Sequence, residues 1–144
     1  MKLKIYTLII LVLLFSGFIF LNVSASSTPV EEIQWHSYDD GMARSKFEKK
    51  KVFLHFTAEW CHYCGVMEKE TFNDPAIISS LNENFISIKV DFDTEAKTSD
   101  FYLVRGLPDT IFIAENGQII GRRPGYIPPE VLKRILKSIL KASS

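Results

Sequence analysis

The feature that most constrains the fold is an apolar run at residues 52–56 (VFLHF), which leads within a few residues into the two cysteines of the chain, Cys61 and Cys64. A nearly continuous apolar run of this length is typical of a central β-strand that is covered on both faces. A helical pattern follows from residue 64 to about residue 70. The sequence therefore predicts a buried strand, then the cysteine pair, then a helix.

Strand and helix patterns alternate along the rest of the chain. Strand-like runs occur at residues 33–38, 85–91, 110–114 and 119–122, and helical patterns at residues 39–50, 76–82, 94–104 and from Pro128 onward. This order predicts an α/β domain with a central mixed β-sheet flanked by helices on both faces.

Local signals support several of these elements. Asp74-Pro75 offers a cap and a first-turn proline for the helix at 76–82, and Asn116-Gly117 between two apolar runs predicts a hairpin. The apolar residues of the last helix recur on one face, as expected for an amphipathic helix. In the helix at 39–50, the residues expected to point inward are Met42, Ala43 and Phe47.

The N-terminal segment has the pattern of an export signal. Lys2 and Lys4 precede an apolar run at residues 5–23, and Val23-Ser24-Ala25 is an acceptable cleavage site. The run is also long enough to span a bilayer, so an uncleaved membrane anchor stays open. We therefore expect a signal peptide or anchor at 1–25, a linker at 26–32 and one folded domain at 33–142. Both alternatives predict a periplasmic or other extracytoplasmic location.

The charge balance excludes one class of partner. Without residues 1–25 the chain keeps 15 basic and 17 acidic residues, a net charge of −2. A nucleic-acid-binding protein usually carries a basic excess, so we expect no nucleic-acid partner. Nothing in the sequence demands a dimer, and a monomer is expected.

The two cysteines have three possible roles: a structural staple, half of a metal site, or a redox pair. A disulfide that closes so short a loop constrains the unfolded chain little. A metal site needs three or four ligands, and beyond the cysteines the chain offers three histidines. Haem attachment needs histidine at position 65, which is glycine. We therefore expect no metal and no organic cofactor.

A redox role follows from the position of the pair. A cysteine at the start of a helix lies at the positive end of the helix dipole, which favours its thiolate and lowers its pKa. Cys61 is therefore the expected nucleophile. Cys64 lies one turn further along, where it can resolve a mixed disulfide formed by Cys61.

The segment Ala58–Cys64 (AEWCHYC), together with Arg105-Gly106-Leu107-Pro108, resembles the thioredoxin superfamily. The resemblance covers roughly residues 33–140. The wider pattern around the cysteines (EWCxxCxxMExxTFxDP) is similar to the C-terminal domain of the DsbD thiol:disulfide interchange proteins and to small exported thioredoxin-like proteins near it. It implies a thioredoxin fold and dithiol–disulfide exchange with protein thiols and disulfides, fed by a membrane or periplasmic electron-transfer partner.

The resemblance also implies roles for residues around the pair. Pro108 would be a cis-proline that faces the cysteines, and the backbone of Leu107 would pair with a substrate chain. Trp60 would cover the motif, although ordinary core packing fits it as well. Glu68 would tune the cysteines as a nearby carboxylate, or would be a solvated helix residue.

Three positions depart from the family pattern. His55 stands where cytoplasmic thioredoxins have a buried aspartate. As a neutral imidazole it would accept the proton of Cys64 during exchange, or it would have no chemical role. His62-Tyr63 replaces Gly-Pro between the cysteines: a charged His62 would stabilise the Cys61 thiolate, and Tyr63 would shield the pair or touch substrate. Asp109 is an extra residue between Pro108 and Thr110, expected to bulge the strand start or shift its register.

These observations predict an extracytoplasmic thiol:disulfide oxidoreductase, with the reducing direction favoured. Two alternatives stay open. One is a disulfide oxidase or isomerase, to which His62 points. The other is a non-catalytic thioredoxin-fold binding module, for which burial of both sulfurs would speak.

Overall fold

The computed structural model describes residues 32–142. The predicted signal or anchor at 1–25 and nearly all of the predicted linker lie outside the described residues. Within the described part, no helix is long and apolar enough to cross a bilayer. The elements are β1 (Trp35–His36), α2 (Tyr38–Glu48), β2 (Lys51–Thr57), α3 (His62–Glu70), α4 (Pro75–Asn84), β3 (Phe85–Asp91), α5 (Ala96–Phe101), β4 (Asp109–Ile113), β5 (Ile119–Pro124) and α6 (Pro129–Lys141).

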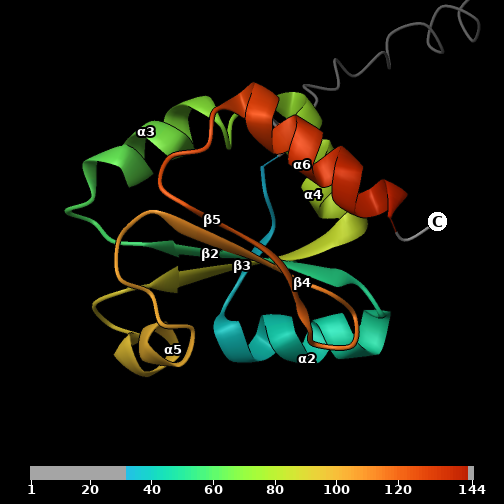
Figure 1. Cartoon of the computed structure of the whole chain (residues 1–144), viewed down its shortest axis with the longest axis horizontal. Coiled ribbons are helices and arrows are strands. Elements are labelled where there is room, and N and C mark those ends of the chain that lie inside the picture. The colour runs from blue at the N-terminus through green and yellow to red at the C-terminus, as the bar shows by residue number, and fades with distance from the viewer. Residues whose placement is uncertain (1–31, 143–144) are drawn as a thin grey trace, which may run out of the picture. The chain divides into compact units, whose positions relative to one another are not determined.

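The strands form one mixed sheet in the order β1-β3-β2-β4-β5. β2 pairs in parallel with β3 and antiparallel with β4, so the predicted strand at residues 52–56 is central, as expected. Helices α3, α4 and α6 lie on one side of the sheet and α2 and α5 on the other (Figure 1). The predicted α/β class, with a mixed sheet flanked on both faces, is confirmed.

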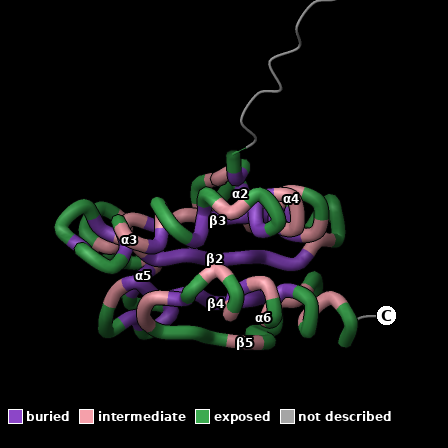
Figure 2. Tube along the Cα trace, turned by 90° about the horizontal axis from the view of Figure 1, so that it is seen from above, coloured by how far each residue is buried: buried purple, intermediate pink, exposed green. Residues whose placement is uncertain are grey.

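Each face of the sheet has its own apolar core. On the α4 and α6 side, Phe53 and Phe112 pack with Leu81 and Leu132. On the α2 and α5 side, Leu54 and the strand residues beside it pack with residues of those two helices. β2 is buried along almost its whole length (Figure 2). Because both faces of β2 are packed, the position of this strand in the sheet is fixed. Its C-terminal end leads directly to the cysteine pair.

Two local expectations are wrong. Of the three residues expected to point inward from α2, only Met42 packs on the core. Ala43 is exposed, Phe47 is 89% exposed, and the buried residues of α2 are Gly41 and Ser45. Asp109 neither bulges the strand start nor shifts its register there; it is the first residue of β4, opposite Phe56 of β2. The irregularity of the hairpin lies further along the strand, between Phe112 and Ile113.

The capping signals are confirmed. Asp74 caps α4 by accepting hydrogen bonds from the N–H groups of Ala76 and Ile77, and a proline opens that helix. Gly117 has φ of 86° in the turn between β4 and β5, a backbone conformation that glycine adopts at no steric cost.

Candidate redox site

The cysteine pair lies where the chain leaves β2 and enters α3. Cys61 is the N-cap of α3, and its Sγ accepts a hydrogen bond from the N–H of Cys64 at 3.2 Å. The helix begins at His62, two residues earlier than expected. The two cysteines form a disulfide with their Cα atoms 5.2 Å apart. Both sulfurs therefore lie at the N-terminal, positive end of α3, as the redox role requires.

The two cysteines differ in exposure. Cys61 is 8% exposed and Cys64 2%, so an incoming sulfur reaches Cys61 more readily. The residues around them are much more open: Trp60 is 67% exposed, Tyr63 60%, and His62 is exposed too. Core packing of Trp60 is thus wrong. Its indole N–H instead donates to Asp93 at 2.7 Å, which ties the ring to the loop after β3.

The apolar floor of the site comes from three separate segments. Ala58 is buried against the cysteines, and Phe92 and Leu107 pack on this cluster. The peptide bond between Leu107 and Pro108 is cis, as the resemblance implied, and Pro108 is buried. The structure therefore brings the Leu107-Pro108 segment and the cysteine pair together.

His55 is completely buried on β2. Its Nδ1 lies 3.1 Å from Thr110 Oγ1, whereas its Nε2 has no hydrogen-bond partner. The ring packs edge-on to Phe72, 4.9 Å between centroids. Burial, and secondarily the charge of Lys89, lowers the pKa of His55 to about 3. Burial therefore favours the neutral imidazole, and the role of His55 toward Cys64 stays a prediction.

Glu68 lies on α3 as one arm of an ion pair. Its carboxylate is 2.5 Å from Lys89 Nζ, and both side chains are partly exposed. Lys89 in turn lies 4.4 Å from the centre of the Trp35 ring. Glu68 is therefore neither an isolated solvated residue nor a bare carboxylate, because its charge is offset by Lys89. Its predicted effect on the cysteines stays a prediction.

Sequence reasoning missed Phe92, Lys89 and Asp93. For Lys89 there was a signal, since it is the one charged residue inside the otherwise apolar or small run 85–90 of strand β3. The positions of Phe92 and Asp93 depend on the loop after β3, which no local pattern specifies.

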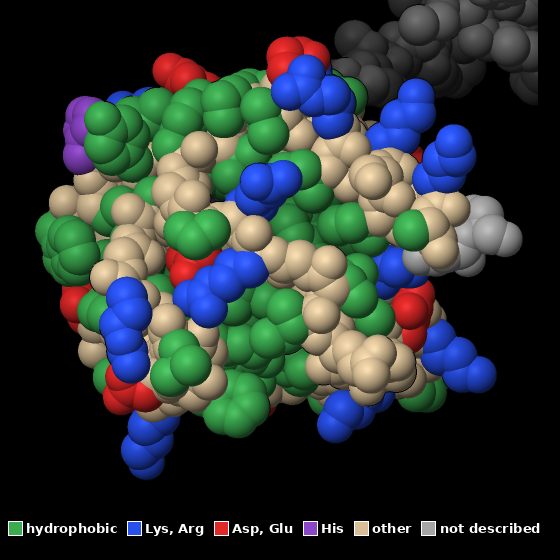
Figure 3. Space-filling model, in the orientation of Figure 1, with side chains coloured by type: hydrophobic (Ala, Val, Ile, Leu, Met, Phe, Trp, Pro, Cys, Tyr) green, Lys and Arg blue, Asp and Glu red, His purple; other side chains and the backbone are tan. Residues whose placement is uncertain are grey.

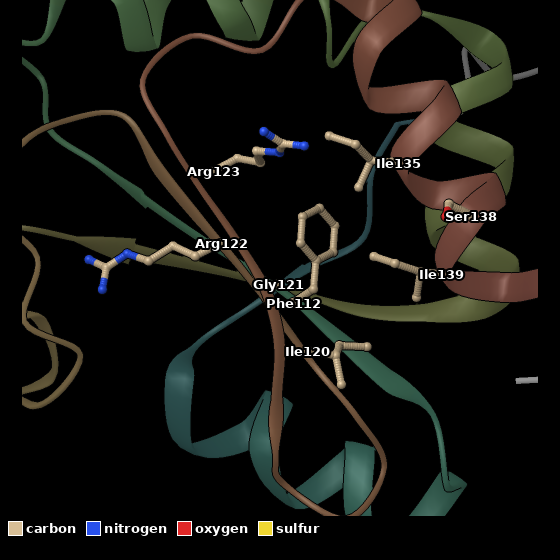
Figure 4. A pocket seen from close by; sticks show the side chains of 8 residues that line it. All are labelled: Phe112, Ile120, Gly121, Arg122, Arg123, Ile135, Ser138 and Ile139. Atoms are coloured by element: carbon tan, nitrogen blue, oxygen red, sulfur yellow. The ribbon is translucent and has the colours of Figure 1, made fainter. Parts of the chain in front are cut away.

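The described residues offer no metal-binding cluster, and one groove lies away from the cysteines. Among residues 32–142, no group of three or more His, Cys, Asp or Glu side chains could hold a metal ion. A groove of about 260 Å³ lies between β5 and α6, on a face where hydrophobic side chains gather between Lys and Arg side chains (Figures 3 and 4). No cysteine lines this groove, so it is separate from the redox site.

The family is shown by comparison with known proteins. A family model for a thioredoxin-like domain matches residues 38–140. A thioredoxin of Mycoplasmoides gallisepticum is 32% identical over 88 residues, which cover 61% of this chain and 83% of that protein. The DsbD thiol:disulfide interchange protein of Campylobacter jejuni is 31% identical over 121 residues, 81% of this chain.

The coverage of these relatives differs. The match spans only 21% of the DsbD protein, and 13–14% of other curated relatives. Among solved structures, a thioredoxin from Thermus thermophilus aligns with a TM-score of 0.69 at 24% identity, covering 76% of this chain and 88% of that one. This structure shows the shared fold. The family model covers most of the chain, which therefore belongs to the thioredoxin-like family, and its two cysteines form the Cys61–Cys64 disulfide.

Proposed function

We propose that the protein reduces disulfides of other proteins outside the cytoplasm, through the Cys61–Cys64 dithiol. The observation that carries this proposal is the position of Cys61 as the N-cap of α3, with its Sγ accepting the N–H of Cys64. In the reduced protein the same N–H and the helix dipole stabilise a thiolate at Cys61. A thiolate is the form that attacks a disulfide.

Reduction of a substrate proceeds in two exchanges. The Cys61 thiolate attacks one sulfur of the substrate disulfide; a mixed disulfide forms, and the other substrate sulfur leaves as a thiolate that takes up a proton. Cys64, once deprotonated, attacks Cys61 Sγ and releases the second substrate thiol. The substrate gains two electrons, and the protein ends with the Cys61–Cys64 disulfide seen here.

The substrate chain is proposed to lie beside Leu107 and Pro108. Leu107 packs against the cysteine cluster and lies two residues before the start of β4. Exposed Trp60 and Tyr63 offer apolar surface on the flank of the pair. An extended polypeptide pairing with the Leu107 backbone would then present its disulfide to Cys61.

The reducing direction is supported by the similarity to DsbD thiol:disulfide interchange proteins. Each cycle leaves the pair oxidised, so a membrane or periplasmic partner must return two electrons. The extracytoplasmic location is supported by the basic and apolar pattern of residues 1–25. Cell fractionation and N-terminal sequencing of the mature protein test this location, and recovery with the cytoplasm would contradict it.

A second candidate is a binding module that keeps its disulfide closed. The low exposure of both cysteines, 8% and 2%, favours it. The two candidates differ in whether turnover depends on a free thiol at Cys61.

The deciding experiment is reduction of insulin by dithiothreitol in the presence of the purified protein. We expect Cys61→Ser to abolish the acceleration. Reduced Cys64→Ser, incubated with insulin after dithiothreitol has been removed, should accumulate a mixed disulfide between Cys61 and insulin, visible by mass spectrometry. An unchanged rate with Cys61→Ser would favour the binding module instead.

A further inference from the structure

Arg122, on β5, binds both ends of the segment that carries Leu107 and Pro108. Its Nε and Nη2 donate to Asp109 Oδ2 at 3.0 and 2.5 Å. Its Nη1 donates to the carbonyl of Tyr102 at 2.9 Å and its Nη2 to that of Leu103 at 3.2 Å. One guanidinium therefore bridges Leu103, four residues before Leu107, and Asp109, the residue directly after Pro108.

The carboxylate of Asp109 is buried and depends on Arg122 as its pairing partner. Its side chain is 2% exposed, and that of Arg122 33%. A buried carboxylate is costly unless it is paired and hydrogen-bonded, and here the pairing partner comes from the next strand. The carbonyls of Tyr102 and Leu103 follow the last turn of α5, where backbone acceptors lack helical partners. Leu103 also has φ of 55°, a backbone conformation that costs energy for leucine, and the contact with Arg122 holds it.

The neighbouring arginine serves as an internal contrast. Arg122 and Arg123 point to opposite sides of β5: Arg122 away from α6, and Arg123 toward Ile135 of α6 (Figure 4).

A second contact joins the end of β5 to the Leu107-Pro108 segment: the backbone N–H of Gly125, just after β5, donates to the carbonyl of Pro108 at 2.7 Å. Contacts from the end of β5 thus hold the Leu107-Pro108 segment in place.

We propose that Arg122 and Asp109 are positioning residues for protein substrates: together they fix the Leu107-Pro108 backbone in the orientation that receives a substrate chain. This inference rests on the proposed function. It predicts a division between substrates, because a small disulfide needs the Cys61 sulfur alone whereas a polypeptide also needs the backbone beside it.

The test uses Arg122→Lys in the full-length protein. Lysine keeps the charge but lacks the planar fork that reaches three acceptors at once. We expect kcat/KM for insulin reduction to fall at least tenfold, mainly through a higher KM. The rate with hydroxyethyl disulfide should fall less than threefold, and the reduction potential should stay at the wild-type value.

Three further variants complete the design. Arg123→Lys is the matched control and should change neither rate more than twofold. Asp109→Asn, which keeps the size of the side chain, should shift the KM for insulin in the same direction by a smaller factor. The double variant should lose no more than Arg122→Lys alone, because the two residues act as one unit.

The outcomes separate this inference from the function on which it rests. If the wild type accelerates neither reaction, the oxidoreductase function itself fails. If the wild type is active and Arg122→Lys slows both substrates equally, or neither, the positioning role is wrong. An Arg122→Lys protein that does not fold leaves the decision to Asp109→Asn, for which an unchanged KM for insulin also overturns the proposal.

Discussion

His55 is the residue at which this site departs most clearly from the aspartate expected of a cytoplasmic thioredoxin. It is fully buried among aromatic rings, and its pKa is lowered to about 3 by burial and by Lys89. A base with so low a pKa holds a proton weakly at neutral pH. We therefore expect His55→Gln to retain insulin reduction within about threefold of the wild type at pH 7. A hundredfold loss would show that His55 is the proton acceptor for Cys64 after all.

The same lowered pKa makes stability depend on pH. In the unfolded chain His55 binds a proton below about pH 6.5, but in the folded protein only near pH 3. Its contribution to stability is present above pH 6.5 and is lost as the pH falls toward 3. The free energy of unfolding should drop by about 2 kcal/mol more between pH 7 and pH 5 in the wild type than in His55→Gln. Urea unfolding at the two pH values measures this, and parallel losses in both proteins would contradict the assignment.

At the scale of the elements, helix α2 approaches the sheet unusually closely. A Cβ placed on Gly41 would lie against Cγ1 of buried Ile88 and 2.6 Å from its Cδ1. Overpacking of this kind costs about 1–3 kcal/mol, which exceeds the gain of up to about 1 kcal/mol in helix propensity. We expect Gly41→Ala to destabilise the protein by about 1 kcal/mol in urea unfolding.

Gly65 on α3 is the matched control, since a Cβ there meets nothing within 4 Å. Gly65→Ala should raise the free energy of unfolding by about 0.5–1 kcal/mol. Equal effects of the two substitutions would mean that α2 does not press on β3 as described.

Some features of the helices and strands could be predicted from the sequence and others could not. Signals confined to a few residues predicted their elements: the apolar run at 52–56, the cap at Asp74, and the Asn116-Gly117 turn all lie where expected. The inward face of α2 was predicted only in part: Met42 packs on the core, whereas Ala43 and Phe47 are exposed. Gly41 faces the sheet instead, because there is no room for a larger side chain beside Ile88.

Within the site, the cysteines and the cis-proline followed from motifs. The partner of Asp109 did not, because Arg122 lies 13 residues away and meets it only through the pairing of β4 with β5. The same limit applies to Glu68, whose partner Lys89 comes from another element. Short motifs thus predict which residues react, while the residues that hold them depend on strand register.

At the scale of the whole molecule, the described domain is held by two apolar cores, one on each face of the sheet. The disulfide adds little to them, because its cysteines are only three positions apart. The loop-entropy relation gives about 2 kcal/mol for so short a loop, against nearly 5 kcal/mol for a loop of about 100 residues. We expect the reduced protein to stay folded and to unfold in urea with a free energy lower by at most about 2 kcal/mol. Unfolding on addition of dithiothreitol would return the pair to a structural role.

The central claim is that this domain delivers electrons through Cys61 and Cys64, and the reduction potential of the pair tests it most directly. The protein is equilibrated in dithiothreitol and glutathione buffers, and the fraction of disulfide is read by thiol labelling and mass spectrometry. A potential near −270 mV, about that of thioredoxin, is the value expected of a reductant fed by a partner. A potential between about −180 and −120 mV would place the protein with the isomerases and oxidases and would contradict the reducing direction.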